Sequence, residues 1–251
     1  METKQPPPDM DIEKTFNEFV EDFGGELVSK IFQGRGTRPD NADYFFYKRT
    51  MVAELKCLKK NYFNDKEVGE KLTVLMNRWW KEGLLRQEHI QGGRFQTDNL
   101  PRQCALEVDK VFGISIKKAV EKANKQIKET KKYFGIPNAK GLLIIANDGN
   151  YSIDLEFIRH ILGNILQSMY TSIDSYIFFT PNMRAYTSQI DTQFHIWVSG
   201  RCRPSSNAVE RDLLDEIQQG WTFFLERKTG ETVTQFHIQD RNTMDTIKWV
   251  R

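Results

Sequence analysis

Two charged residues, Glu54 and Lys56, interrupt the otherwise apolar stretch MVAELKCLKK at residues 51–60. The stretch is typical of a β-strand, and side chains in a strand alternate between its two faces. One face is wholly apolar and carries Met51, Ala53, Leu55 and Cys57. Glu54 and Lys56 therefore share the other face, between Val52 and Leu58. Two interpretations fit: a salt bridge on a solvent-exposed face, or a carboxylate and an ammonium group positioned for chemistry.

A second carboxylate comes into reach through the preceding strand, ADYFFY at residues 42–47. A turn symmetric about Lys48 and Arg49 places Asp43 directly opposite Glu54, with Cβ atoms roughly 5 Å apart. A three-residue turn would instead shift the register by one and make the pairing diagonal. Two bare carboxylates at this distance repel, and a divalent cation between them reverses that repulsion, because Mg²⁺ prefers oxygen ligands. A lysine beside such an ion can hold a water molecule or stabilise charge on a phosphate group.

These residues carry a resemblance to a known family. RPDNADYFF followed by MVAELKCLKK resembles the PD-(D/E)XK nuclease superfamily, particularly its small bacterial or phage members, over roughly residues 11–147. The resemblance implies a restriction-endonuclease-like αβββαβ core. It also implies Mg²⁺ or Mn²⁺ held by Asp43, Glu54 and the main-chain carbonyl of Leu55, with Lys56 near the attacking water. Asp40 also matches the motif's letters, but it lies in a predicted loop, so Asp43 is the expected ligand.

Further site residues are expected on two helices. Members of the superfamily often carry another acidic residue on the first helix, and the candidates here are Glu18, Glu21, Asp22 and Glu26. Glu21 and Glu26 lie near the centre of that helix, on either side of the glycine break, although each can equally be a solvated residue. In related nucleases, the helix that corresponds to the one before GLLIIAND often carries a glutamine or lysine that faces the site. Lys122 and Gln126 are four residues apart and share a helix face, which either binds phosphate or forms a solvated flank.

The expected partner is nucleic acid, most simply DNA. Binding it requires a local concentration of basic residues, because the net charge of the chain is only +2. Two predicted glycine-containing loops, QGRGTRP and QGGRFQTDNLPRQ, carry Arg35, Arg38, Arg94 and Arg102. Such loops can contact a phosphate backbone or remain ordinary surface loops. The lysine-rich helix predicted at 106–134 can also follow a phosphate backbone, but its interleaved acidic residues favour a solvated face.

The hydrophobic pattern predicts one mixed α/β domain with helices packed against a central sheet. Helices are predicted over 11–33 (bent or split at Gly24-Gly25), 64–86, 106–134, 152–170 and 207–219. Strands are predicted at ADYFFY, MVAELKCL, GLLIIAND, SYIFFTP, QFHIWVSG, FFLER and TVTQFHI. We expect a disordered lead-in over 1–10 and a nuclease core over 11–150 with a helical insertion around 60–105. Residues 151–251 are expected to continue the same domain.

Composition narrows the remaining possibilities. The three cysteines are widely separated, which argues against a disulfide framework or a CxxC zinc site and predicts a reducing, cytoplasmic location. No apolar run approaches the roughly 18 residues that span a bilayer, so no membrane partner is expected. The adjacent Trp79 and Trp80 cannot share one narrow helix stripe, so one of them packs against the insertion or against a second subunit of a homodimer.

The expected function is metal-dependent hydrolysis of phosphodiester bonds, with endonuclease action expected over exonuclease action. Phage defence is the biological role that small stand-alone members suggest. The alternative is a catalytically inactive scaffold of the same fold that binds nucleic acid or protein.

Overall fold

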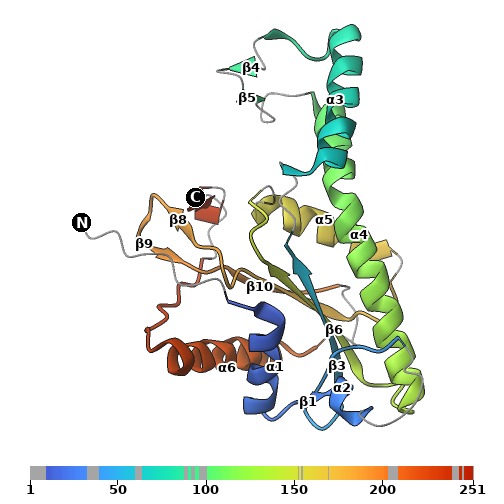
Figure 1. Cartoon of the computed structure of the whole chain (residues 1–251), viewed down its shortest axis with the longest axis vertical. Helices are drawn as coiled ribbons and strands as arrows, with labels where there is room; N and C mark the ends of the chain where they lie inside the picture. Colours follow the sequence, from blue (N-terminus) through green and yellow to red (C-terminus); the bar gives the residue numbers. More distant parts are fainter. Residues whose placement is uncertain are drawn as a thin grey trace.

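The computed structural model describes residues 10–32, 40–59, 64–87, 90–91, 94–95, 101–151, 153, 155–168, 170–202, 209–238, 243–244 and 246–250. At its centre lies a six-stranded sheet with the order β1-β2-β3-β6-β7-β10 (Figure 1). Its strands are β1 (Glu26–Leu27), β2 (Tyr44–Phe46), β3 (Met51–Leu58), β6 (Lys140–Asn147), β7 (Ser175–Phe179) and β10 (Trp197–Arg201). Neighbours are antiparallel except in β3-β6-β7, whose strands run parallel. The predicted mixed α/β architecture is confirmed.

Helices cover both faces of the sheet. One face packs against α1 (Ile12–Asp22) and α6 (Arg211–Thr229), the other against α4 (Arg102–Tyr133) and α5 (Leu155–Ser168). Met51, Ala53 and Leu55 of β3 are buried on the α1/α6 face, whereas Val52 and Leu58 are buried on the α4/α5 face. The predicted alternation of β3 is therefore confirmed, and Glu54 and Lys56 belong to the α4 side.

A helical arm projects beyond the sheet and consists of α3 (Lys66–Lys81) and the first half of α4 (Figure 1). A small two-stranded sheet, β4 (Ile90–Gln91) with β5 (Arg94–Phe95), lies beside it. Trp79 is buried and donates its indole N–H to Glu107 Oε2 of α4 at 2.7 Å, whereas Trp80 is 54% exposed. Trp79, which itself belongs to the predicted insertion, thus packs against α4. In the part of the chain that is described, no helix is both long and apolar enough to cross a bilayer.

The first predicted helix is split at the glycine pair, and the strand β1 between its two parts was not predicted. Helix α1 ends at Asp22, and the chain continues through Gly24, with a φ of 83°, into β1 and the short helix α2 (Val28–Ile31). Gly25 explains the close return of the chain, because a Cβ atom there would lie 2.7 Å from Val20 Cγ1 and 2.9 Å from the Phe45 carbonyl oxygen. The glycine pair therefore separates a helix from a strand instead of bending one helix.

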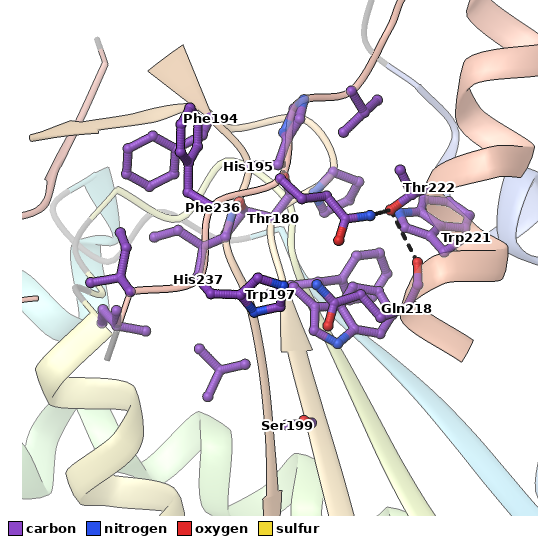
Figure 2. Close-up of a pocket in the computed structure, with 18 of the residues that line it drawn as sticks. Thr180, Phe194, His195, Trp197, Ser199, Gln218, Trp221, Thr222, Phe236 and His237 are labelled. Atoms are coloured by element: carbon purple, nitrogen blue, oxygen red, sulfur yellow. Dashed lines mark hydrogen bonds between the residues drawn. The ribbon is translucent and has the colours of Figure 1, made fainter. Parts of the chain in front are cut away.

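The C-terminal strand predictions also need correction. FFLER lies inside α6, where Trp221, Phe224 and Leu225 are buried at helical spacing. TVTQFHI forms no regular helix or strand; its residues Phe236 and His237 line a cavity next to β10 (Figure 2). QFHIWVSG is divided between β9 (Ile190–Phe194) and β10. A second, three-stranded sheet of β11 (Lys248–Trp249), β8 (Ala185–Thr187) and β9 was not predicted.

The break between β9 and β10 has a specific cause. The Ile196 N–H bonds to Thr180 Oγ1 at 2.9 Å, and His195 Nδ1 lies 2.8 Å from the Thr180 carbonyl oxygen and 3.0 Å from that of Met183. Thr180 thus still donates its N–H to the Ile196 carbonyl at 3.0 Å, but its own carbonyl lies against the His195 ring instead of accepting the Ile196 N–H.

Gly141 of β6 provides a test of this packing. A Cβ atom at this position would lie 1.8 Å from the Ser172 carbonyl oxygen, which is backbone and cannot rotate away. We expect Gly141→Ala to lower the free energy of unfolding by more than about 3 kcal/mol, measured by urea denaturation. The matched control is Gly163→Ala in α5, where a Cβ meets nothing within 4 Å and alanine should stabilise the helix by about 0.5–1 kcal/mol. Equal effects of the two substitutions would contradict the contact.

Candidate functional site

The β2–β3 hairpin brings Asp43 opposite Glu54. Tyr44 pairs with Ala53, Phe45 with Val52 and Phe46 with Met51, and this register continues to Asp43 and Glu54. The connecting turn holds Tyr47, Lys48 and Arg49 at φ values of 50°, 54° and 67°. The register predicted for the symmetric turn is therefore confirmed, and the shifted, diagonal alternative is wrong.

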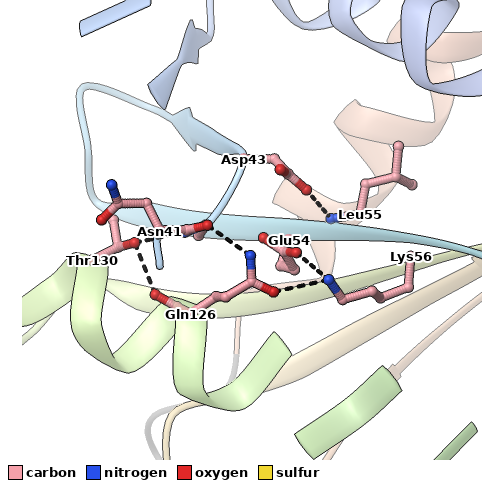
Figure 3. Close-up of polar contacts among 8 residues, drawn as sticks. Asn41, Asp43, Glu54, Leu55, Lys56, Gln126 and Thr130 are labelled. Carbon is pink, nitrogen blue, oxygen red and sulfur yellow. Dashed lines mark hydrogen bonds and ion pairs between the residues drawn. The ribbon is translucent and has the colours of Figure 1, made fainter. Parts of the chain in front are cut away.

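Asp43 ends the pairing between the two strands. It lies one residue before β2, not within a strand as expected, and its Oδ2 accepts the Leu55 N–H at 2.9 Å (Figure 3). A strand residue presents its N–H and C=O toward the same neighbour, so the Leu55 carbonyl also points toward the Asp43 side. Beyond Ala53, β3 continues past the end of β2, and this edge carries the candidate site.

Glu54 is buried, with 1% of its surface exposed, so a salt bridge on a solvent-exposed face is excluded. Its Oε1 accepts a hydrogen bond from Lys56 Nζ. Its Oε2 is buried, and no hydrogen-bond donor within the described ranges reaches it. The Asp43 carboxyl is within hydrogen-bonding reach of Glu54, but two carboxylates can share such a bond only when one is protonated.

This arrangement disfavours negative charge on both acids. Burial and the negative charge of Asp43 raise the pKa of Glu54 to about 8, although the Lys56 ammonium opposes the shift. Burial also raises the pKa of Asp43, partly offset by the Leu55 N–H and by Lys56. The two acids therefore titrate as a coupled pair that retains a proton near neutral pH when nothing else neutralises it.

Helix α4 supports the site from below. Gln126 is buried; its Oε1 accepts from Lys56 Nζ at 2.9 Å, and its Nε2 donates to the Asn41 carbonyl at 2.8 Å (Figure 3). One turn further, Thr130 Oγ1 accepts the Ala42 N–H at 2.7 Å. The same helix thus holds both the loop that carries Asp43 and the Lys56 ammonium. Of the predicted pair, Gln126 joins the site, whereas Lys122 is exposed one turn away.

The predicted acids of the first helix lie elsewhere. Each pairs with a basic partner: Glu18 with Lys228, Glu21 with Lys30, Asp22 with Arg227 and Glu26 with Arg49. The acid of α1 that approaches the site is Glu13, which sequence reasoning missed. Glu13 lies 3.6 Å from Lys59 just beyond the end of β3, and its charge adds to the effect of burial on the pKa of Asp43. Glu13 differs from the other acids of α1 only in that the packing of α1 against β3 brings its end of the helix close to the site.

The predicted arginine loops are not assembled at the site. Arg35 and Arg38 lie outside the described residues. Arg94 begins β5, and its side chain is likewise outside the description. Arg102 is the exposed first residue of α4, so its assignment to a loop is wrong. It precedes Gln126 by 24 residues of continuous helix, about 36 Å at the rise of an α-helix.

The donor set at this edge suits a hard cation with few protein ligands. The described residues contain no group of three or more His, Cys, Asp or Glu side chains that could hold a metal ion. Two carboxylates and a carbonyl remain, which fits Mg²⁺ because this ion usually keeps several waters. The buried Glu54 Oε2 facing a second carboxylate is the feature that a cation would satisfy.

Comparison of the chain with protein-family models, with curated proteins and with solved structures finds no match. Function is therefore inferred from the residues of this site and their surroundings.

Glu54 should make stability depend on pH in the absence of metal. The folded state keeps the Glu54 proton up to about pH 8, whereas the unfolded chain releases it near the ordinary value of 4.5. Between these limits the folded state binds more protons, so the free energy of unfolding falls as pH rises, by up to about 1.4 kcal/mol per pH unit. Glu54→Gln cannot titrate, and its stability relative to wild type should rise from pH 5 to pH 8.

The measurement is urea denaturation in EDTA at several pH values. Glu21→Gln, an exposed substitution in an ion pair, should keep the wild-type profile. Parallel profiles of unfolding free energy against pH for wild type and Glu54→Gln would show that Glu54 is ionised throughout. That result would contradict the proton retained by the Asp43–Glu54 pair.

Proposed function

We propose that this protein is a Mg²⁺- or Mn²⁺-dependent nuclease that hydrolyses phosphodiester bonds in DNA. The observation that carries the proposal is the buried, unpartnered Glu54 Oε2 beside the Asp43 carboxyl, with an ammonium group fixed next to both. A carboxyl pair buried at this energetic disadvantage is typical of a functional site, because structure alone gains nothing from it.

The residues of the site have separate proposed roles in metal binding and in hydrolysis. Asp43, Glu54 and the Leu55 carbonyl are the proposed ligands. A bound divalent ion supplies Lewis acidity and lowers the pKa of its water. Lys56 Nζ, held between Glu54 Oε1 and Gln126 Oε1, has a further N–H to orient the attacking water or to stabilise charge on the phosphate. Glu54 must lose its proton to serve as a ligand, so metal affinity should rise with pH.

The order of elements around the site supports the proposal. Helix α1 is followed by the antiparallel strands β1, β2 and β3, then by α4 and by β6, which runs parallel to β3. This order is compatible with the αβββαβ order that the sequence resemblance implies, once α2 and the elements α3, β4 and β5 are set aside as insertions. Gln126 of α4 then acts as a positioning residue for Lys56 and for the loop before Asp43.

Exposed lysines near the site provide the proposed contacts to the substrate backbone. Lys122 lies one helical turn before Gln126 on the exposed side of α4, and Lys59 follows the end of β3. Lysine contacts to phosphates position a nucleic acid without reading its sequence. We therefore expect binding that weakens steeply as salt is raised.

Cleavage of supercoiled plasmid is the direct test. Wild type should nick plasmid with Mg²⁺ or Mn²⁺ and not with EDTA, and Lys56→Ala should be slower by about 100-fold or more. The matched control is Lys71→Ala, since Lys71 also pairs with a glutamate but lies on the arm helix α3. Plasmid, linear duplex, single-stranded DNA and RNA are compared under the same conditions. A wild type that binds metal but cleaves none of these would contradict the nuclease proposal.

Metal binding is tested separately by Mn²⁺ calorimetry and by thermal unfolding. An ion that binds only the folded state stabilises it, by about 2.7 kcal/mol at 100 times its dissociation constant. We expect Mn²⁺ to raise the unfolding temperature of wild type and to leave Asp43→Asn unchanged. Asp22→Asn, which removes an exposed carboxylate of α1, should respond as wild type does. Equal responses of wild type and Asp43→Asn would place the ion elsewhere.

A further inference from the structure

A second candidate site lies at the far edge of the sheet. A cavity of about 400 Å³ borders the edge strand β10 and is closed by α6 and by residues 233–238 (Figure 2). Two strands, β6 and β7, separate β10 from β3, so this cavity is distinct from the Asp43–Glu54 site. Its size falls within the range of small-molecule pockets.

One face of α6 forms a mixed polar and apolar wall. The lining residues Arg211, Asp215, Gln218, Thr222 and Leu225 recur at helical spacing. The 233–238 segment forms a further part of the lining and is fixed to α6 at two points. The Val233 N–H bonds to Glu226 Oε1 at 2.9 Å, and Gln235 Nε2 bonds to Thr222 Oγ1 at 3.0 Å.

Aromatic rings supply much of the remaining lining. Trp197, Trp221, Phe194, Phe236 and His237 all border the cavity (Figure 2). Trp197 lies against Phe179, with ring centroids 5.3 Å apart, so its indole is held in place from the sheet side. Planar aromatic surfaces of this kind stack favourably on flat heterocycles such as nucleobases.

Two lining residues carry a ring nitrogen that has no hydrogen-bond partner among the described residues. Trp197 Nε1 is buried, and no acceptor among the described residues reaches it. Both groups near His195 Nδ1 are carbonyl oxygens, so Nδ1 carries the proton. Burial lowers the pKa of His195, which keeps the ring neutral and makes Nε2 an acceptor. The cavity wall therefore holds one donor and one acceptor, the two functions found together on a base edge.

A cation completes the lining on the α5 side. Arg159 Nη1 lies 3.1 Å from Met244 Sδ, and a thioether is a weak acceptor for a guanidinium. Within the described part of the chain, no carboxylate forms an ion pair with Arg159. A planar guanidinium that has no carboxylate partner is suited to bind a phosphate group, which it can contact through two N–H groups.

We propose that this cavity binds a free mononucleotide. The base lies among the aromatic rings and uses the open donor of Trp197, and the phosphate lies at Arg159. This site does not depend on the proposed nuclease function, since it uses no residue of the Asp43–Glu54 site.

Calorimetry in EDTA with AMP, adenosine and ribose 5-phosphate tests the assignment in parts. Wild type should bind AMP one to one, more tightly than either fragment. Trp197→Phe keeps an aromatic ring but removes the N–H, and should weaken both AMP and adenosine by about tenfold. Arg159→Gln should weaken AMP by about tenfold and leave adenosine unchanged. The matched controls are Trp80→Phe on α3 and Arg201→Gln at the end of β10, both exposed and outside the lining, and both should bind as wild type does.

Three results would overturn the proposal. The first is no AMP binding at millimolar concentration. The second is AMP binding that Trp197→Phe and Arg159→Gln both leave unchanged. The third is binding of a short oligonucleotide without binding of any mononucleotide, which would assign the surface to a nucleic-acid strand. Because EDTA removes divalent ions, none of these results bears on the metal site, and a failed plasmid assay would not affect this test.

Discussion

The hydrogen bond between the Leu55 N–H and the Asp43 carboxylate is the constraint on which the candidate site depends. Here the Asp43 side chain takes the place of the next backbone hydrogen bond between β2 and β3. The Leu55 N–H is therefore satisfied, although β2 does not continue along this part of β3. The same bond fixes the Asp43 carboxyl opposite the buried Glu54, where neither acid is ionised at low cost. A free backbone edge and a proton-sharing acid pair thus arise from one contact at the end of a short strand.

The surroundings of this pair convert an unfavourable arrangement into a rigid one. Gln126 has no charge to contribute, yet its amide connects Lys56 to the loop before Asp43, and Thr130 holds the same loop at Ala42. A buried polar network is stabilising only when its members are satisfied, and here Glu54 Oε2 and Asn41 Oδ1 have no hydrogen-bond partner among the described residues. Glu54 Oε2 lies at the centre of the site, as expected where stability is given up locally for function.

Sequence reasoning reached the parts of the site that depend on local geometry. Strand alternation placed Glu54 and Lys56 on one face, and turn symmetry set Asp43 opposite Glu54. Gln126 was indicated by the family resemblance, as one of a pair with Lys122. Sequence reasoning failed where long-range packing decides. Nothing local distinguishes Glu13 from the other acids of α1, and FFLER is as apolar in a helix as in a strand. The break at His195 depends on carbonyl groups of Thr180 and Met183 that no sequence pattern near His195 reveals.

The turn at Tyr47–Arg49 connects the two halves of the chain. Three successive non-glycine residues adopt the left-handed region there, which is costly without outside support. Tyr47 Oη bonds to the Leu213 carbonyl and to Glu216 of α6, and Arg49 bonds to Glu26 while lying over the ring of Phe45. The C-terminal helix thus braces the hairpin that carries the acids. A fragment that stopped before α6 would retain every proposed catalytic residue and lose the contacts of α6 with Tyr47 in the turn, so the half of the chain that carries the motif depends on the C-terminal helix.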